Sequence, residues 1–240
     1  MNKQNQFTSF LNKANEFLSE VNLDLVCYIF YDVLQLLHCR LERKAGVGKT
    51  PRLLKDVQLK ASEITGILVM VDYLNRTLDT VNVEGQLHEL FGPDYSEDDY
   101  LKYFRNYLVG ELTDRYERLI SITEKAIKYM YKDDSGGHSV GSSFFETSRG
   151  KRVPWIKHTI QNSKCVFKRT TKNKETLLYI TKYRIPIENH QSVIDTLLVV
   201  VKRGCLAKNA PYEFKTAYTV SRHNQVLKKI EACHPAFVKK

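Results

Sequence analysis

The chain has 240 residues, of which 42% are hydrophobic and 27% charged, and its formal net charge is +10. This length suits one sizeable core or at most two small ones, and the composition is ordinary for a globular protein. The five cysteines are widely spaced and include no Cys-x-x-Cys pair, which argues against a disulfide framework and against a structural zinc site.

The first half of the chain reads as long helices. Apolar residues recur at helical spacing from about residue 7 to residue 41, and again from Pro51 to Leu78. A third helix is expected over Asp99–Tyr131, because a capping Ser96 and three acidic residues precede an apolar stripe with spacings of three and four. Eleven glycines and six prolines are few for this length, which disfavours a turn-dense β fold.

The second half follows a Gly- and Ser-rich loop at residues 133–143. Helices are expected at 154–165, from Pro186 or Asn189 to Lys202, and at 212–232, whereas 177–183 could be a helix or a strand. The predicted fold is therefore all-α, an elongated bundle of about six to eight helices, with room for minor β structure in 140–185. We expect one helical domain over 1–240, with a division into 1–132 and a basic part at 144–240 as the alternative.

Charge is unevenly distributed along the chain. Residues 141–240 hold 20 Lys and Arg against 6 Asp and Glu, whereas residues 1–140 hold 17 against 21. This asymmetry predicts a polyanion-binding surface in the second half, although a solvated basic face would look the same. The polar amino terminus and the short apolar runs predict a cytoplasmic protein that makes no membrane contact.

Most catalytic motifs are absent or incomplete. Residues 45–50, Ala-Gly-Val-Gly-Lys-Thr, resemble the end of a phosphate-binding loop, but Arg43 occupies the position of the first glycine and Pro51 follows directly. The histidines show no metal-ligand spacing, so we expect neither a metal nor another cofactor.

What remains are two Arg–His pairs, each with five intervening residues: Arg184 with His190, and Arg152 with His158. Such a spacing arises easily by chance. The first pair stands out because Pro186 holds Ile185 extended and His190 would begin an apolar helix. A helix amino terminus keeps an imidazole neutral and welcomes a phosphate, which suits metal-free phosphodiester cleavage. A surface pair at a helix end is the alternative.

The stretch from Tyr183 to His190 resembles the signature of the HEPN superfamily of helical ribonuclease domains, an Arg followed after four to six residues by a His at the start of a late helix. One departure is Ile185, because a polar residue commonly follows the Arg in that family. The resemblance implies a homodimer, metal-independent RNA cleavage with His190 as acid or base and Arg184 stabilising the phosphate, and a role in toxin–antitoxin or antiviral defence.

The basic second half fits an RNA substrate. The residues expected to bind nucleic acid are Asn189, Lys164, Lys168, Arg169, Lys172, Lys174 and Lys182, and the aromatic rings of Trp155, Tyr179 and Tyr183 could stack on bases. Two other functions stay open: a non-catalytic basic subunit that binds nucleic acid within a larger complex, and a protein-interaction module whose charge is incidental.

Overall fold

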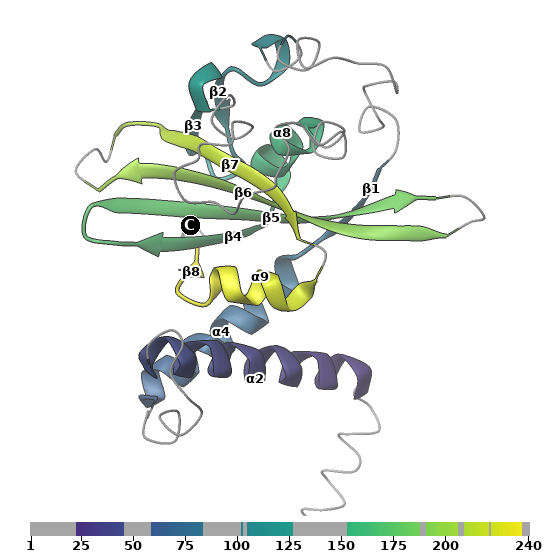
Figure 1. The fold of residues 1–240 in the computed structure, drawn as a ribbon, viewed down its shortest axis with the longest axis vertical. Helices are drawn as coiled ribbons and strands as arrows, with labels where there is room; N and C mark the ends of the chain where they lie inside the picture. The colour runs from purple at the N-terminus through teal and green to yellow at the C-terminus, as the bar shows by residue number, and fades with distance from the viewer. Residues whose placement is uncertain are drawn as a thin grey trace, which may run out of the picture. The chain divides into compact units, whose positions relative to one another are not determined.

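The computed structural model describes residues 23–45, 59–83, 102, 105–126, 153–187, 191–205, 209–220 and 222–236. The chain divides into two compact units, and the boundary in the sequence lies between Asn75 and Arg76. The first unit holds helix α2 (Leu23–Ala45) and most of helix α4 (Ala61–Thr77). The second unit holds every strand of the described residues (Figure 1).

The two helices of the first unit pack antiparallel. Lys44 Nζ lies 2.6 Å from a Glu63 carboxylate oxygen, and near the other end Asn75 Nδ2 lies 3.5 Å from Asp32 Oδ2. The buried side of α4 carries Ile67, Met70, Val71, Tyr73 and Leu74, at the spacing of one helix face. Within the part of the chain that the structure describes, neither of these helices nor any other is long and apolar enough to cross a membrane.

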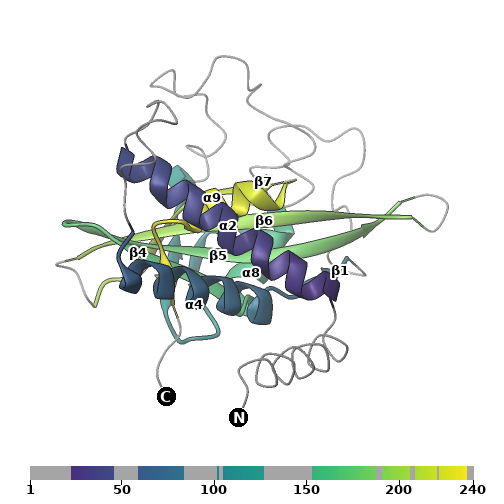
Figure 2. The ribbon, with the colours of Figure 1, turned by 90° about the horizontal axis from the view of Figure 1, so that it is seen from below.

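The second unit is built on an eight-stranded mixed sheet. Its strands, among the described residues, are β1 (Thr80–Asn82), β2 (Gly110–Thr113), β3 (Leu119–Ile122), β4 (Cys165–Thr170), β5 (Lys174–Pro186), β6 (Ser192–Gly204), β7 (Tyr212–Val220) and β8 (His234–Pro235). The order across the sheet is β2-β3-β7-β6-β5-β4-β8, and β1 pairs in parallel with the far part of β5. The long strands β5 and β6 run side by side (Figure 2).

The sheet contradicts the predicted all-α fold and the helical bundle that the HEPN resemblance implied. Strand structure does lie within 140–185, but it belongs to the dominant sheet and is no minor element. The small number of glycines and prolines did not exclude a β fold, because β5 and β6 are each 13 residues long and long strands need few turns. The helix expected at 154–165 is present as α8 (Val153–Asn162), but it ends three residues earlier than predicted and Cys165 begins β4.

The single helix predicted over Asp99–Tyr131 is wrong, because the strands β2 and β3 interrupt the described helical residues 102, 105–107 and 124–126. The strands β2 and β3 form an antiparallel hairpin around a turn at Asp114–Arg118. Buried Ile120 and Ile122 are two residues apart, the period of a strand, although Leu108, Leu112 and Leu119 also fit a helical stripe. The turn overrides the stripe because Asp114 binds backbone amides within it.

The helices predicted at 189–202 and 212–232 are also wrong. The apolar run from Leu197 to Val201 is the centre of β6, and it is apolar throughout because both faces of the sheet are covered. Its β-branched residues fit a strand. Residues 212–220 form β7, and only the later part of the second segment is helical, as α9 (His223–Ile230).

Two helices lie on opposite faces of the sheet (Figure 1). Helix α8 contacts β5 and β6 on one face, through Trp155, Ile156 and Ile160, which are buried at helical spacing. The same core takes Leu177, Tyr179 and Tyr183, alternate residues of β5. Helix α9 contacts β7 and buries Val226, Leu227 and Ile230.

Candidate functional site

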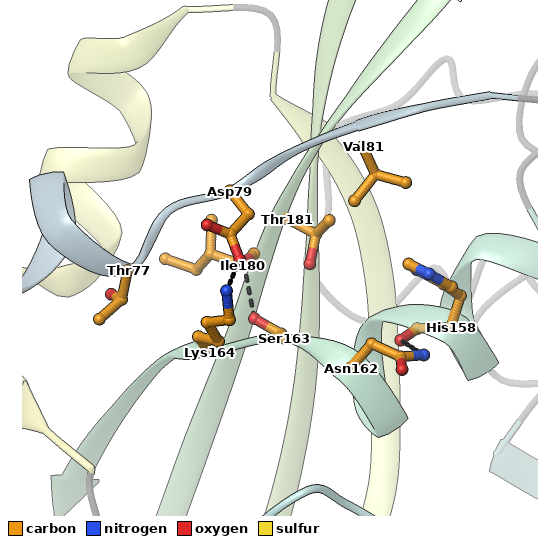
Figure 3. Close-up of a pocket in the computed structure, with 9 residues that line it drawn as sticks. All are labelled: Thr77, Asp79, Val81, His158, Asn162, Ser163, Lys164, Ile180 and Thr181. Atoms are coloured by element: carbon orange, nitrogen blue, oxygen red, sulfur yellow. Dashed lines mark hydrogen bonds and ion pairs between the residues drawn. The ribbon is translucent and has the colours of Figure 1, made fainter.

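A small pocket opens where two strands meet end to end along one edge of β5. Strand β4 pairs with β5 as far as Ile180, and β1 takes over from Lys182. The segments that lead into these strands and the end of α8 therefore converge there (Figure 3). The pocket is lined by Thr77, Asp79, Val81, His158, Asn162, Ser163, Lys164, Ile180 and Thr181.

The cavity measures about 30 Å³, which is room for about two water molecules. Pockets that enclose a whole small ligand are roughly ten times larger or more. A substrate here would have to lie across the opening and present one small group to the pocket. A polymer strand that passes over the surface meets that requirement.

The ring of His158 is hydrogen-bonded to Tyr183. The Tyr183 hydroxyl lies 3.2 Å from the backbone oxygen of Trp155, 2.9 Å from Thr159 Oγ1 and 2.9 Å from His158 Nδ1. The single hydroxyl proton can go to only one of these groups. When it goes to the Trp155 oxygen, His158 Nδ1 donates to Tyr183 and Nε2 keeps a free lone pair.

The same surroundings keep His158 neutral and well oriented. Burial lowers the pKa of His158 below its ordinary value, because a charged imidazolium would lose hydration. Burial also raises the pKa of Tyr183, so its hydroxyl stays protonated. The His158 ring meets the Tyr183 ring edge-on, with centroids 5.8 Å apart, and Tyr183 stacks on Trp155 at 4.4 Å. A neutral, oriented imidazole with a bare Nε2 is a competent general base at pH 7.

Figure 3 shows the imidazole extending from α8 toward Val81 on β1. Across the pocket, Lys164 Nζ lies 2.8 Å from Asp79 Oδ2, and both side chains are about half exposed. An ion pair with this exposure is worth only about 0–1 kcal/mol. Lys164 can therefore leave Asp79 for a stronger anion at little cost.

Ser163 serves the fold and is no nucleophile. Its Oγ lies 2.7 Å from the backbone oxygen of Ile180 and accepts from the Cys165 amide at 3.2 Å. These bonds bridge the gap in the edge of β5 between β1 and β4. A buried hydroxyl with its proton held by a carbonyl has no proton to give to a base.

The predicted catalytic pair is placed in part. Arg184 is exposed on β5, where its Nη1 lies 3.4 Å from Ser192 Oγ. Successive strand residues point to opposite faces, so Arg184 points away from the face where Tyr183 meets His158. His190 and Asn189 lie outside the described residues, and so does Arg152 of the second pair.

The basic residues predicted to bind nucleic acid divide into two groups. Lys164 and Lys182 lie near the pocket, whereas Lys168, Arg169, Lys172 and Lys174 lie at the other end of the β4–β5 hairpin. Lys182 and Lys174 are eight residues apart on one strand, which corresponds to about 26 Å. Of these residues only Lys164 lines the pocket, because Lys182, like Arg184, points to the face opposite Tyr183.

The aromatic residues proposed for base stacking are unavailable. Trp155 is 4% exposed, and Tyr179 and Tyr183 are fully buried. Sequence reasoning identified Tyr183 as a neighbour of Arg184 and missed its contact with His158. Asp79 was also missed, because only the fold brings β1 beside β5.

Within the described residues, no group of three or more His, Cys, Asp and Glu side chains is placed to hold a metal ion. Comparisons with protein-family models, with curated proteins and with solved structures gave no match to this chain.

Proposed function

We propose that the second unit is a metal-independent endoribonuclease in which His158 Nε2 is the general base. The observations that carry this proposal are the hydrogen bond between the Tyr183 hydroxyl and His158 Nδ1 and the position of Lys164 in the lining of the same pocket. In the proposed state Tyr183 accepts the Nδ1 proton, which leaves Nε2 with a free lone pair. Cleavage of RNA without a metal needs these two groups, a base for the ribose 2′-hydroxyl and a positive charge for the phosphate.

The proposed reaction is a transesterification. His158 Nε2 takes the 2′-hydroxyl proton, and the 2′-oxygen attacks the adjacent phosphorus. The bond from phosphorus to the 5′-oxygen breaks, that oxygen takes up a proton from water, and His158 releases its proton to water. The products are a 2′,3′-cyclic phosphate and a free 5′-hydroxyl. Lys164, released from Asp79, stabilises the charge that builds on the phosphate oxygens.

The deciding experiment measures cleavage of single-stranded RNA in the presence of a chelator. Native protein, His158→Gln and the matched control His234→Gln are compared, because His234 is an exposed histidine on β8. We expect His158→Gln to lose about 10²–10⁴-fold in rate and the control to keep native activity. The product should carry a cyclic phosphate, and a 2′-deoxy nucleotide at the cleaved position should block the reaction.

The Arg184–His190 pair is tested in the same assay. If Arg184→Ala and His190→Ala abolish cleavage while His158→Gln leaves it intact, the catalytic groups are those first expected from the sequence.

Binding without cleavage is the second candidate function. The observation that favours it is the exposed basic group Lys168, Arg169, Lys172 and Lys174 at the β4–β5 turn, far along the sheet from the pocket. This second function predicts that the affinity for RNA falls steeply as the salt concentration rises and that the native protein does not cleave RNA.

A further inference from the structure

The turn at Asp114–Arg118, which joins β2 to β3, is held by a network of hydrogen bonds centred on Asp114. Asp114 is 4% exposed and accepts hydrogen bonds from the amides of Tyr116 and Arg118, from Arg118 Nε at 2.7 Å and from the Tyr179 hydroxyl at 2.7 Å. Glu117 has a φ of 63°, the left-handed position that closes a three-residue hairpin loop. The Asp114 hydrogen bonds therefore hold Arg115, Tyr116 and Glu117 in one defined loop conformation.

The turn is attached directly to the wall of the His158 pocket. The Tyr116 hydroxyl donates to the backbone oxygen of Lys164 at 2.8 Å, and Arg115 Nη1 lies 3.4 Å from the backbone oxygen of Asn162. Both Asn162 and Lys164 line the pocket. Asn162 is in turn one helical turn from His158, whose backbone oxygen it binds at 3.0 Å.

Arg115 is the exposed cation of this turn. Arg118 forms an ion pair with the carboxylate of Asp114 and packs 4.7 Å from the centroid of the Tyr116 ring, so Asp114 largely neutralises its charge. Arg115 is exposed, its guanidinium lies 5.8 Å from the centroid of the Tyr116 ring, and its Nη1 lies 3.4 Å from the backbone oxygen of Asn162. A guanidinium has five N–H donors, so most of them remain available to a ligand.

From these contacts we propose that Arg115 is a phosphate-binding residue, which holds the phosphate next to the scissile one in a single-stranded nucleic acid. Asp114 and Tyr116 are positioning residues for it. The inference rests on the proposed function for the identity of the scissile phosphate. It does not depend on cleavage for the binding itself, because a guanidinium recognises a phosphate oxyanion in either case.

The test uses a single-stranded DNA oligonucleotide, which lacks the 2′-hydroxyl and cannot be cut. Its affinity is measured by fluorescence anisotropy over a series of salt concentrations for native protein, Arg115→Gln and Arg169→Gln. Arg169 is the matched control, an exposed arginine at the distant end of β4. Loss of one phosphate contact should weaken binding several-fold at low salt and flatten the slope of log K against log salt by about 0.7.

The result that overturns the proposal is an unchanged slope in Arg115→Gln, or an equal change in Arg169→Gln, which would describe a diffuse basic surface. Tyr116→Phe removes only the hydroxyl bond to Lys164, and it should lower affinity while the melting temperature stays near native. If Tyr116→Phe binds as native protein does, Tyr116 has no positioning role.

Cleavage kinetics separate the two proposals. With RNA, Arg115→Gln should raise KM and leave kcat nearly unchanged, since the contact is made equally in the ground state and the transition state. If His158→Gln cuts normally while Arg115→Gln still flattens the salt slope, the catalytic assignment fails and the phosphate site stands.

Discussion

The Tyr183 hydroxyl lies 2.9 Å from Nδ1 of His158, and this bond joins the centre of the sheet to the helix that covers it. Tyr183 is fully buried and held against Trp155, so its oxygen has a fixed position. The bond therefore sets the direction of the imidazole ring, and it selects the tautomer protonated on Nδ1 when Tyr183 donates to Trp155. A functional group in a loop would have no comparable support.

Replacing Tyr183 with Phe keeps the ring stacked on Trp155 and removes only the oxygen. The Nδ1 proton of His158 then has no acceptor, so both tautomers become accessible and the ring can turn. We expect a fall in kcat of up to about 100-fold with a small change in KM. The loss of buried hydrogen bonds should lower the free energy of unfolding by about 1–3 kcal/mol. Tyr31→Phe, at a residue of the first unit that is 48% exposed, is the control and should leave both quantities unchanged.

The rate of RNA cleavage should rise with pH as His158 loses its proton. Because burial lowers the pKa of His158 from the ordinary 6.5, the midpoint of this rise should lie below pH 6.5 and activity should be full at neutral pH. The pH profile of kcat/KM in native protein gives the measurement. A midpoint above 6.5 would contradict a base held in a desolvating site.

Protonation of His158 should also make the free energy of unfolding depend on pH. Between the folded pKa of His158 and 6.5, the unfolded chain binds more protons than the folded chain, so the free energy of unfolding falls as the pH falls through this window. Urea unfolding of native protein and His158→Gln at about pH 5 and about pH 7.5 should show a larger acid loss in native protein. Equal losses of stability in the two proteins would mean that His158 does not contribute to the pH dependence of unfolding.

Ser163→Ala tests the junction between β1 and β4. The substitution leaves the backbone oxygen of Ile180 and the amide of Cys165 without their partner in a buried place. We expect a loss of about 1–3 kcal/mol in the free energy of unfolding, measured by urea titration. Ser192→Ala is the matched control, because Ser192 is exposed and has one long contact to Arg184. Its effect should stay within about 0.5 kcal/mol.

Asp114→Ala should be more damaging than any single change at the pocket rim. It removes a buried carboxylate and leaves the Arg118 guanidinium, whose side chain is 17% exposed, without its counter-charge. Breaking a buried pair in this way costs about 3–5 kcal/mol. Thermal or urea unfolding measures the loss, and Asp79→Ala, which breaks the half-exposed pair with Lys164, should cost less than about 1 kcal/mol.

Parts of this structure could be predicted from local pattern alone. Helix α8 was predicted in this way, because Trp155, Ile156 and Ile160 lie on one helix face and Pro154 suits the first turn of a helix. The long strands were missed for a physical reason. A strand buried on both faces shows neither the period of a strand nor that of a helix, and Leu197 to Val201 is such a run.

The sequence by itself determined the ordinary globular composition, the basic second half and the presence of a histidine on α8 behind an aromatic residue. Only the tertiary structure decided which groups surround His158. Tyr183, 25 residues away, meets it through the packing of α8 on β5, and Asp79 reaches the same pocket because β1 pairs with β5. Contacts of this kind depend on strand register, which a linear spacing such as that of Arg184 and His190 does not contain.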